Sequence, residues 1–454
     1  MADLTSDFCG IKSPNPFWLA SAPPANCGEQ VMRAFDAGWG GAVWKTLGEP
    51  IVNVSSRFGA IDYGGSKAIG FNNIELITDR PISTNLKEIY ETKKRYPNHA
   101  VIVSLMVETK EQWKDLIKRA EDTGADGLEL NFGCPHGMCE RGMGSAVGQE
   151  PKILTEITSW AKEYATTPVI VKLTPNIGDI RDPGLAAIKG NADAVSLINT
   201  IKSIVGVDLN TFVPKPVVGN ESTNGGYCGP AVKPIAQHMV ASLARMEGFN
   251  IPISGIGGVS DWRDAAEFLA LGATNVQVCT AVMINGYRIV EDMIEGLSDF
   301  LDEKGMKSVD ELVGKSIPHY TEWQDLDLNY QVVARIDADT CIGCQRCYTA
   351  CLDGAHQCIH TDAGPCEAWH GESDHGFNPR AEVAQAVQHE AKDPEGVRVP
   401  WIDEAECVGC NLCQIVCPVP ECITMTEIPS KEGRKSWSDR AKEGTTLVHN
   451  GLHG

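Results

Sequence analysis

The chain has 454 residues, 43% of them hydrophobic, and its formal net charge of −21 at pH 7 argues against nucleic-acid binding, which requires neutralisation of phosphates. Its length allows about three domains, or one barrel with an appended domain, and no apolar run approaches the ~18 residues that span a membrane. The N-terminal segment lacks the pattern of a secretory signal, so we expect a cytoplasmic protein whose 17 cysteines serve as metal ligands and thiols, not as disulfides.

Short apolar segments alternate with amphipathic stretches through the first part of the chain. The expected strands span 17–20, 41–46, 100–107, 127–131, 168–173, 193–199, 251–257 and 275–280. Helical patterns lie between them, for example at 110–125 and 261–273. Eight strands, each followed by a helix, over about 300 residues predict an α/β fold of the (β/α)8 TIM barrel type at residues 1–315. A doubly wound sheet is the alternative, and it is weakened by the lack of a G-x-G-x-x-G turn.

A second domain is expected after a linker at residues 316–334. Residues 335–429 contain the spacing C-x2-C-x2-C-x3-C twice. The two repeats are Cys341, Cys344, Cys347 and Cys351, then Cys407, Cys410, Cys413 and Cys417. Such a pair is the ligand set of a ferredoxin-like α+β domain with two [4Fe-4S] clusters, in which the fourth cysteine of each repeat binds the other cluster. A disulfide framework and two zinc sites are the alternatives, but zinc ligands normally come as two separated pairs.

An insertion at 352–406 separates the two repeats, and a tail at 430–454 follows the domain. Further potential ligands in and after the insertion are His356, Cys358, His360, Cys366, His370, His375 and Cys422. Cysteine and histidine could form another metal site. Their irregular spacing favours instead a polar loop that covers the clusters or docks a partner. The tail is expected to be disordered or to wrap a partner.

Polar residues and glycines end most of the expected barrel strands. They are Lys45, Thr46, Asn131, Cys134, Lys172, Thr174, Asn199, Thr200, Gly257, Gly258, Cys279 and Thr280. A single strand-end Lys is commonly solvated and a single Asn commonly forms a turn, but in a TIM barrel all these ends meet at one catalytic mouth. Glycines after the last strands leave backbone N–H groups for a phosphate, and Lys172 could stabilise an electron-rich isoalloxazine. One phosphate site without a dinucleotide fold favours FMN over FAD.

Several of these phrases resemble those of a known family. Residues 1–315 are similar to the FMN-binding barrel of dihydroorotate and dihydropyrimidine dehydrogenases. The phrases Asn73-Ile-Glu75-Leu-Ile77, Asn131-Phe-Gly-Cys134-Pro-His-Gly, Lys172-Leu-Thr-Pro-Asn176 and Asn199-Thr200 look like the dihydropyrimidine branch. With the cysteine repeats included, nearly the whole chain resembles the catalytic subunits of bacterial NAD-dependent dihydropyrimidine dehydrogenases.

The resemblance implies roles for individual residues. Cys134 would be the general acid that gives a proton to C5 of the pyrimidine, while reduced FMN gives hydride to C6. Ring-binding residues would be Asn73, Glu75, Ile77, Asn131, Asn199 and Thr200. Flavin-binding residues would be Ser21, Ala22, Lys45, Thr46, Lys172, Gly229, Gly257, Gly258, Cys279 and Thr280. Gly133 replaces a serine that is usual before the catalytic cysteine, so one hydroxyl contact to the substrate is missing.

The chemistry of a thiol agrees with the role implied for Cys134. A pKa near ~8.5 suits proton exchange with carbon close to neutral pH. The loop that carries it is rich in glycine, as a closing lid should be: Gly133, Gly137, Gly142, Gly144 and Gly148. Cys139 lies in the same segment and could be confused with the acid. Cys9, Cys27 and Cys228 are interpreted as structural thiols.

Three functional hypotheses follow from the sequence. The first is reversible reduction of uracil or thymine to the 5,6-dihydropyrimidine. The second is oxidation of dihydroorotate or of a related cyclic amide, and Glu75 disfavours orotate because its charge would repel a carboxylate. The third is a non-catalytic iron-sulfur electron carrier.

The expected partner is a separate flavoprotein that binds FAD and NAD. Two clusters imply that electrons arrive from outside the chain, and the chain has no G-x-G-x-x-G turn for a dinucleotide. The resemblance implies that this flavoprotein oxidises NADH and docks near the clusters. By analogy with the family, the assembly is expected to be a homodimer or heterotetramer.

Overall fold

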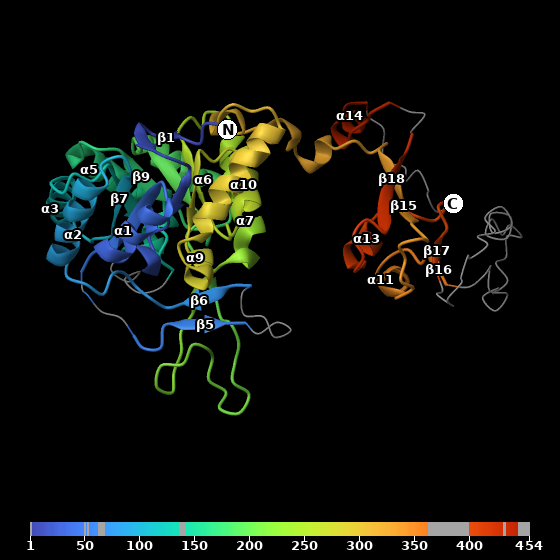
Figure 1. Ribbon diagram of the computed structural model, residues 1–454, viewed down its shortest axis with the longest axis horizontal. Helices are drawn as coiled ribbons and strands as arrows, with labels where there is room; N and C mark the ends of the chain where they lie inside the picture. The colour runs from blue at the N-terminus through green and yellow to red at the C-terminus, as the bar shows by residue number, and fades with distance from the viewer. Residues whose placement is uncertain are drawn as a thin grey trace, which may run out of the picture. The chain divides into compact units, whose positions relative to one another are not determined.

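The computed structural model describes residues 2–49, 51, 54–61, 69–135, 142–361, 399–429 and 433–443 (Figure 1). The chain forms two compact units, residues 1–320 and 321–454. Each unit is described by itself below. Every helix among the described residues is too short or too polar to cross a membrane.

Eight parallel strands close into a barrel in the first unit. Their order, β3-β4-β7-β8-β9-β10-β13-β14, follows the chain, and β14 returns to pair with β3. The strands are β3 (Phe17–Leu19), β4 (Gly41–Leu47), β7 (Ala100–Leu105), β8 (Gly127–Asn131), β9 (Val169–Lys172), β10 (Ala194–Leu197), β13 (Ile253–Ile256) and β14 (Asn275–Val278). Each overlaps one of the predicted segments. The predicted TIM barrel is therefore confirmed, and the doubly wound alternative is wrong.

Helices follow the strands and surround the barrel (Figure 1). The long ones are α1 (Gly28–Ala37), α2 (Ile82–Arg95), α3 (Lys110–Glu121), α5 (Pro151–Tyr164), α6 (Arg181–Lys189), α7 (Lys233–Ala244), α8 (Trp262–Ala270) and α10 (Ile289–Glu303). Shorter ones are η1 (Pro23–Ala25), α4 (Ser145–Gly148), η3 (Pro230–Val232), α9 (Thr280–Asn285), η4 (Val309–Glu311) and η5 (Ile317–His319). Helix α3 begins with a capping box between Thr109 and Gln112, and its buried residues recur at helical spacing from Trp113 to Ala120.

An N-terminal hairpin closes one end of the barrel. It consists of β1 (Ser6–Phe8) and β2 (Ile11–Ser13), which pair antiparallel. Phe8 and Ile11 pack with inward-facing barrel residues, and the ring of Phe8 lies 5.6 Å from that of Trp18, edge to face. This end is filled by apolar side chains, so the polar strand ends at the opposite, C-terminal face are left to form the site.

A second sheet lies beyond the barrel strands, where Figure 1 shows β5 and β6. It is antiparallel, in the order β11-β12-β6-β5. The strands are β5 (Phe58–Ala60), β6 (Phe71–Asn73), β11 (Ile201–Ser203) and β12 (Gly225–Cys228). The register pairs Asn73 with Gly226 and Ile201 with Tyr227. The sheet therefore joins the loops that follow β4 and β10 at the mouth.

The second unit is a small α+β arrangement. Its strands are β15 (Gln331–Ile336), β16 (Ile359–His360), β17 (Trp401–Ile402) and β18 (Ile423–Ile428), in the antiparallel pairs β15-β18 and β16-β17. Its helices are η6 (Trp323–Asp325), α11 (Arg346–Gly354), α13 (Leu412–Val416) and α14 (Trp437–Lys442). Strand β15 begins inside the expected linker, because Val333 and Ala334 turn into the core of this unit and are 1% and 2% exposed. Within the expected tail, α14 has a capping box at Ser436 and Asp439.

The two cysteine repeats have matching backbones. Gly343 and Gly409 have φ of 66° and 67°, and both repeats continue with a left-handed residue, Gln345 or Asn411. The N–H of Asp337 donates to the carbonyl of Cys422 at 2.8 Å, and the N–H of Asp403 donates to that of Cys358 at the same distance. Cys358 and Cys422 therefore hold equivalent positions in the two halves of the unit.

Candidate active site

A cavity with an empty volume of about 1120 Å³ lies at the C-terminal ends of the barrel strands. The expected site residues on its wall are Ser21, Ala22, Lys45, Thr46, Asn73, Glu75, Ile77, Asn131, Cys134, Lys172, Asn199, Thr200, Gly229, Gly257, Gly258, Cys279 and Thr280. Gly133 and Thr174 were also expected at the mouth, but they do not line the cavity. Residues expected from separate strands and loops therefore surround one space, large enough for a cofactor and a small substrate.

Two lysines reach the cavity from the barrel strands β4 and β9, and each is paired with a buried carboxylate. Lys45, near the end of β4, lies 3.0 Å from Glu75. Lys172, the last residue of β9, lies 3.5 Å from Glu129 of β8. Each of the four side chains is at most 8% exposed. Such ions are tolerated in the interior because they are paired.

Glu75 contacts a second cation as well. Arg57 lies 3.2 Å from Glu75 and 3.0 Å from Asp79. We expected Glu75 to accept a hydrogen bond from the substrate ring, and its carboxylate already binds Lys45 and Arg57. A substrate N–H would share this carboxylate with the two cations.

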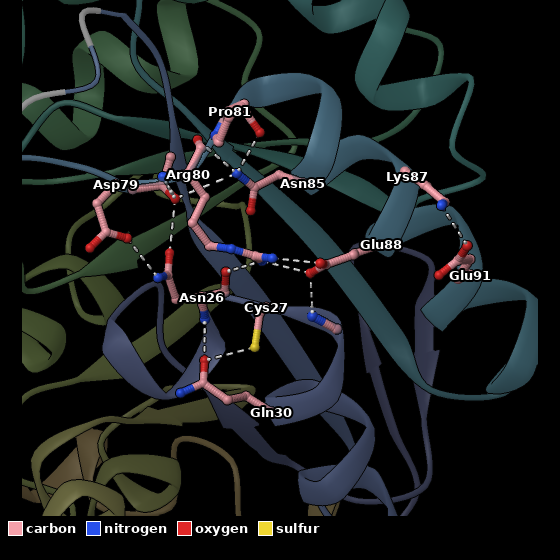
Figure 2. Close-up of polar contacts among 12 residues, drawn as sticks. Asn26, Cys27, Gln30, Asp79, Arg80, Pro81, Asn85, Lys87, Glu88 and Glu91 are labelled. Carbon is pink, nitrogen blue, oxygen red and sulfur yellow. Dashed lines mark hydrogen bonds and ion pairs between the residues drawn. The ribbon is translucent and has the colours of Figure 1, made fainter.

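The loop that follows β6 and carries Glu75 is fastened to α1 and α2 by polar contacts (Figure 2). Asn26 donates to Asp79 at 3.1 Å. Arg80 donates to Glu88 at 2.6 Å, and Glu88 also accepts from the N–H of Gly28 at 2.8 Å. The Arg80 guanidinium holds the pKa of the Glu88 carboxyl below its ordinary value. These contacts fix the loop from which Glu75 points into the cavity.

A chain of hydrogen bonds joins the expected flavin-binding residues to the expected ring-binding residues. Ser21 Oγ lies 3.2 Å from Thr46 Oγ1. Thr46 Oγ1 accepts from Asn131 Nδ2 at 3.0 Å, and Asn131 Oδ1 accepts from Asn199 Nδ2 at 3.0 Å. Asn199 Oδ1 accepts from the N–H of Thr200 at 2.8 Å. The orientation of each amide is thus set by its neighbour.

Gly133 has a packing role at this point of the site. A Cβ atom placed on Gly133 would lie 2.4 Å from Cβ and 2.6 Å from Nδ2 of Asn199. The N–H of Gly133 also donates to Asn131 Oδ1 at 3.2 Å. Glycine therefore allows Asn199 to approach Asn131 closely, and any side chain here would displace Asn199.

Cys134 follows directly and is 4% exposed. Its thiol donates to the carbonyl of Leu76 at 3.6 Å, and it packs with Ile77, Met106 and Met143. The thiol thus lies against the loop that holds Glu75. Gly137 and Cys139, which we expected in a closing lid, lie outside the described residues.

The backbone on the other side of the cavity is crowded at glycines. Gly229 and Gly258 have φ of 104° and 79°. A Cβ atom on Gly258 would lie 2.9 Å from the carbonyl oxygen of Gly229. A side chain at Gly229 or Gly258 would collide with its surroundings, so the backbone of these residues stays open to the cavity and could hold a phosphate.

Some cavity residues were not expected from the sequence. Gln277 of β14 lines the wall, and its buried Oε1 has no hydrogen-bond partner within the described part of the chain. Cys228 and Tyr227 of β12 also line it, although Cys228 had been interpreted as a structural thiol. Burial raises the pKa of Cys228 and of Cys279, so both thiols stay protonated. Glu129 was also not expected from the sequence. It lies two residues before Asn131 on β8, so both side chains point to the same face of the strand, and this spacing could have indicated it.

The second unit contains two small cavities lined by cysteines. The cavity we call the Cys407 cavity has an empty volume of about 340 Å³ and is lined by Cys351, Cys358, Cys407, Cys410 and Cys413. The cavity we call the Cys341 cavity has about 310 Å³ and is lined by Cys341, Cys344, Cys347, Cys417 and Cys422. Each contains three cysteines of one repeat and the fourth of the other.

Four of the thiols in each cavity match in number the ligand set of one [4Fe-4S] cluster. In a [4Fe-4S] cluster each thiolate binds a different iron, so its four ligands stand apart. The donor set therefore fits a cluster in each cavity.

Comparisons with known proteins agree with this geometry. The model of the dihydroorotate dehydrogenase family matches residues 3–301. The chain is 42% identical over 435 residues to the NAD-dependent dihydropyrimidine dehydrogenase subunit PreA of Escherichia coli (strain K12), covering 95% of this chain and 98% of that protein. It is 43% identical over 337 residues to the chloroplastic dihydropyrimidine dehydrogenase (NADP(+)) of Arabidopsis thaliana, covering 71% and 79%.

A further relative represents the dihydroorotate branch. The catalytic subunit of dihydroorotate dehydrogenase B (NAD(+)) of Pyrococcus abyssi is 38% identical over 316 residues, which cover 69% of this chain and 99% of that protein. The match to PreA extends through the cysteine repeats, whereas the family model ends at residue 301. This chain is therefore an oxidoreductase that belongs to the dihydroorotate dehydrogenase family and is similar along nearly its whole length to a dihydropyrimidine dehydrogenase subunit.

Proposed function

We propose that this chain reversibly reduces uracil or thymine to the 5,6-dihydropyrimidine. The observation that carries the proposal is the position of Cys134. Its buried thiol lines the same cavity as the hydrogen-bonded amides of Asn131 and Asn199 and the paired ammonium of Lys172. A proton donor, groups that match a cyclic amide and a cation for an electron-rich ring are thus combined in one site.

The residues of the cavity support FMN as its cofactor, which would supply hydride to C6 of the pyrimidine. Gln277 Oε1 offers a buried acceptor for a ring N–H. Lys172, held by Glu129, can stabilise negative charge on the ring. Ser21, Thr46 and Lys45 would contact the flavin on the wall formed by β3 and β4, and the backbone near Gly229 and Gly258 would hold its phosphate.

Cys134 would act as the general acid of the reaction. A thiol donates a proton to C5 on reduction and takes it back in the reverse direction. Its contact with the carbonyl of Leu76 holds the thiol in place, and Cys134 is 4% exposed. Asn131, Asn199, Thr200 and Asn73 would present amide and hydroxyl groups to the polar edge of the ring.

Glu75 favours a neutral pyrimidine over orotate. Its carboxylate lines the cavity and binds Lys45 and Arg57, so both cations are already neutralised in part. Glu75 and Asp79 together balance the charges of Lys45 and Arg57, so no excess positive charge is left to attract the carboxylate of orotate. The similarity to a dihydroorotate dehydrogenase subunit keeps dihydroorotate oxidation as the second candidate.

The second unit would be a ferredoxin-like domain, residues 335–429, with two [4Fe-4S] clusters that pass single electrons. Cys341, Cys344, Cys347 and Cys417 would hold one cluster, and Cys407, Cys410, Cys413 and Cys351 the other. The relative named as subunit PreA has a name that implies a partner subunit. We infer that an NADH-oxidising flavoprotein is the partner of this chain, in a cytoplasmic assembly.

A substrate screen tests the proposal. Chemically reduced enzyme would be mixed anaerobically with uracil, thymine or orotate, and reoxidation of the flavin would be followed by absorbance. We expect uracil or thymine to reoxidise it and orotate to react slowly. Fast reaction with orotate alone would establish the second candidate, and a protein that releases no FMN on denaturation would contradict the cofactor.

A further inference from the structure

The Cys407 cavity has one cysteine more than a cluster requires. A [4Fe-4S] cluster has four irons and takes four thiolates. Cys351, Cys407, Cys410 and Cys413 supply them, and Cys358 lines the same cavity. The inference below rests on the proposed function, because it concerns how the proposed cluster is held.

Cys358 directs its sulfur toward two of the proposed ligands. Its Sγ lies 3.6 Å from Sγ of Cys351, and the pair is buried. Its thiol also interacts with that of Cys407. The sulfur of Cys358 is thus in van der Waals contact with the sulfur that would bind the iron, so a small movement of one side chain exchanges their positions.

The backbone around Cys358 is well defined. Its carbonyl accepts from the N–H of Asp403 at 2.8 Å, and Ile359, the next residue, pairs with Ile402. Cys422 holds the equivalent position in the other half and lines the Cys341 cavity. Sγ of Cys422 lies 3.8 Å from the carbonyl oxygen of Asp337, and its thiol also interacts with that of Cys417. Cys358 interacts with two ligand thiols, those of Cys351 and Cys407, and is therefore the spare thiol chosen for the test.

We propose that Cys358 is an alternative ligand of this cluster and can replace Cys351. In the exchange, the Cys358 thiol releases its proton to solvent and its sulfur bonds to the iron, while Cys351 leaves the iron and takes up a proton. No electron is transferred and the iron oxidation states do not change. The cluster would therefore survive loss or oxidation of Cys351.

Three variants of the full chain test this: Cys351→Ala, Cys358→Ala and the double variant. Cys410→Ala serves as the matched loss of a ligand, because the contacts of Cys358 are to Cys351 and Cys407. Iron content and the electron paramagnetic resonance spectrum would be measured after anaerobic purification. FMN content would confirm that the first unit is folded in each variant.

We expect about eight irons per chain in the parent protein and in both single variants at positions 351 and 358. The double variant should lose up to half of this iron or show a three-iron signal, as Cys410→Ala should. Equal results for Cys351→Ala and the double variant, whether both keep or both lose the iron, would overturn the inference. A parent protein without iron would instead overturn the proposed clusters themselves.

Discussion

The barrel mouth and the two cysteine cavities are built in opposite ways. At the mouth, several functional side chains are held by side chains from distant segments, as Lys172 is by Glu129 and Asn199 is by Asn131. In the cavities, the cysteines come from two short repeats whose turns at Gly343 and Gly409 have nearly the same φ. A substitution at the mouth should therefore disturb several residues, whereas the effect of replacing a cysteine should be confined to the cluster that this cysteine would bind.

The largest expected effect concerns a binding site for NADH, which we expect neither the barrel mouth nor the cysteine cavities to provide. The sequence contains no G-x-G-x-x-G turn, so we expect the purified chain to oxidise no NADH. It should still reduce a pyrimidine with a low-potential chemical donor, and NADH oxidation should appear when the flavoprotein partner is added. Absorbance at the NADH band would measure this. Rapid pyrimidine-dependent consumption of NADH by the chain alone would show that it also binds the nucleotide.

Cys134→Ala should lower pyrimidine reduction by ~10²-fold or more, because a positioned acid contributes on this scale. FMN and iron should be retained. Cys27→Ala is the control, since Cys27 contacts Gln30 at the start of α1 and is not on the cavity wall. Anaerobic turnover with reduced donor would be compared. An undiminished rate in Cys134→Ala would assign the proton to Cys139 or to solvent.

Glu129→Gln tests whether the mouth depends on its buried pairs. It leaves the Lys172 ammonium without its counter-charge, and breaking a buried pair costs about 3–5 kcal/mol. We expect a lower free energy of unfolding and a flavin that is more weakly bound. The matched change, Glu163→Gln, removes an exposed partner of Lys110 and should have no measurable effect. Equal stability of both variants would contradict a structural role for the buried pair.

Gly133→Ser introduces a side chain that the packing of Asn199 excludes. The contact of 2.4 Å to Asn199 Cβ forces that residue away from Asn131. We expect a loss of about 1–3 kcal/mol of stability and a raised KM for pyrimidine. Gly178→Ser is the control, because a Cβ atom at Gly178 has no neighbour within 4 Å. A lower KM in Gly133→Ser would mean that the added hydroxyl binds substrate and that Asn199 moves without cost.

The smallest expected effect is a pH dependence of stability at the loop that carries Glu75. Arg80 lowers the pKa of Glu88 in the folded protein, so this pair stabilises the fold above the unfolded pKa of the carboxyl, and the contribution is lost as the pH falls. Arg80→Gln should reduce the unfolding free energy by ~1 kcal/mol at pH 7 and by less near pH 4. Denaturant titrations at both pH values would measure it. An equal loss at the two pH values would show that the contribution is not electrostatic.

The sequence predicted the barrel well because its signals are local. Strands such as 127–131 and 168–173 are short apolar runs with amphipathic helices between them, and the order of parallel strands in a barrel follows the chain. The cysteine repeats are similarly local, since the spacing alone indicates cluster ligands. The antiparallel sheet β11-β12-β6-β5 was not predicted, because its central pairing, between β12 and β6, joins segments more than a hundred residues apart, and its strands include glycines, which have low strand propensity.

Site residues at the ends of strands could be predicted from the sequence. Residues that act by contacting another side chain could not. Lys172 and Asn131 follow directly from strand positions. Glu129 and Gln277 lie inside strands, and only the closed barrel shows that their side chains reach Lys172 and the cavity. The pairing of Glu75 with Lys45 and Arg57 likewise needs three segments to be placed together.

The sheet that crosses the mouth has a consequence for the choice of substrate. Asn73 belongs to β6, Thr200 immediately precedes β11, and backbone hydrogen bonds to β12 connect the two strands. Side chains on independent loops could separate to admit a larger ring. Asn73 and Thr200 are far apart in the sequence, but their strands belong to one hydrogen-bonded sheet. The distance between the side chains of Asn73 and Thr200 is then set by the sheet. A pyrimidine ring with a large substituent would be rejected by its size, whatever hydrogen bonds it could form.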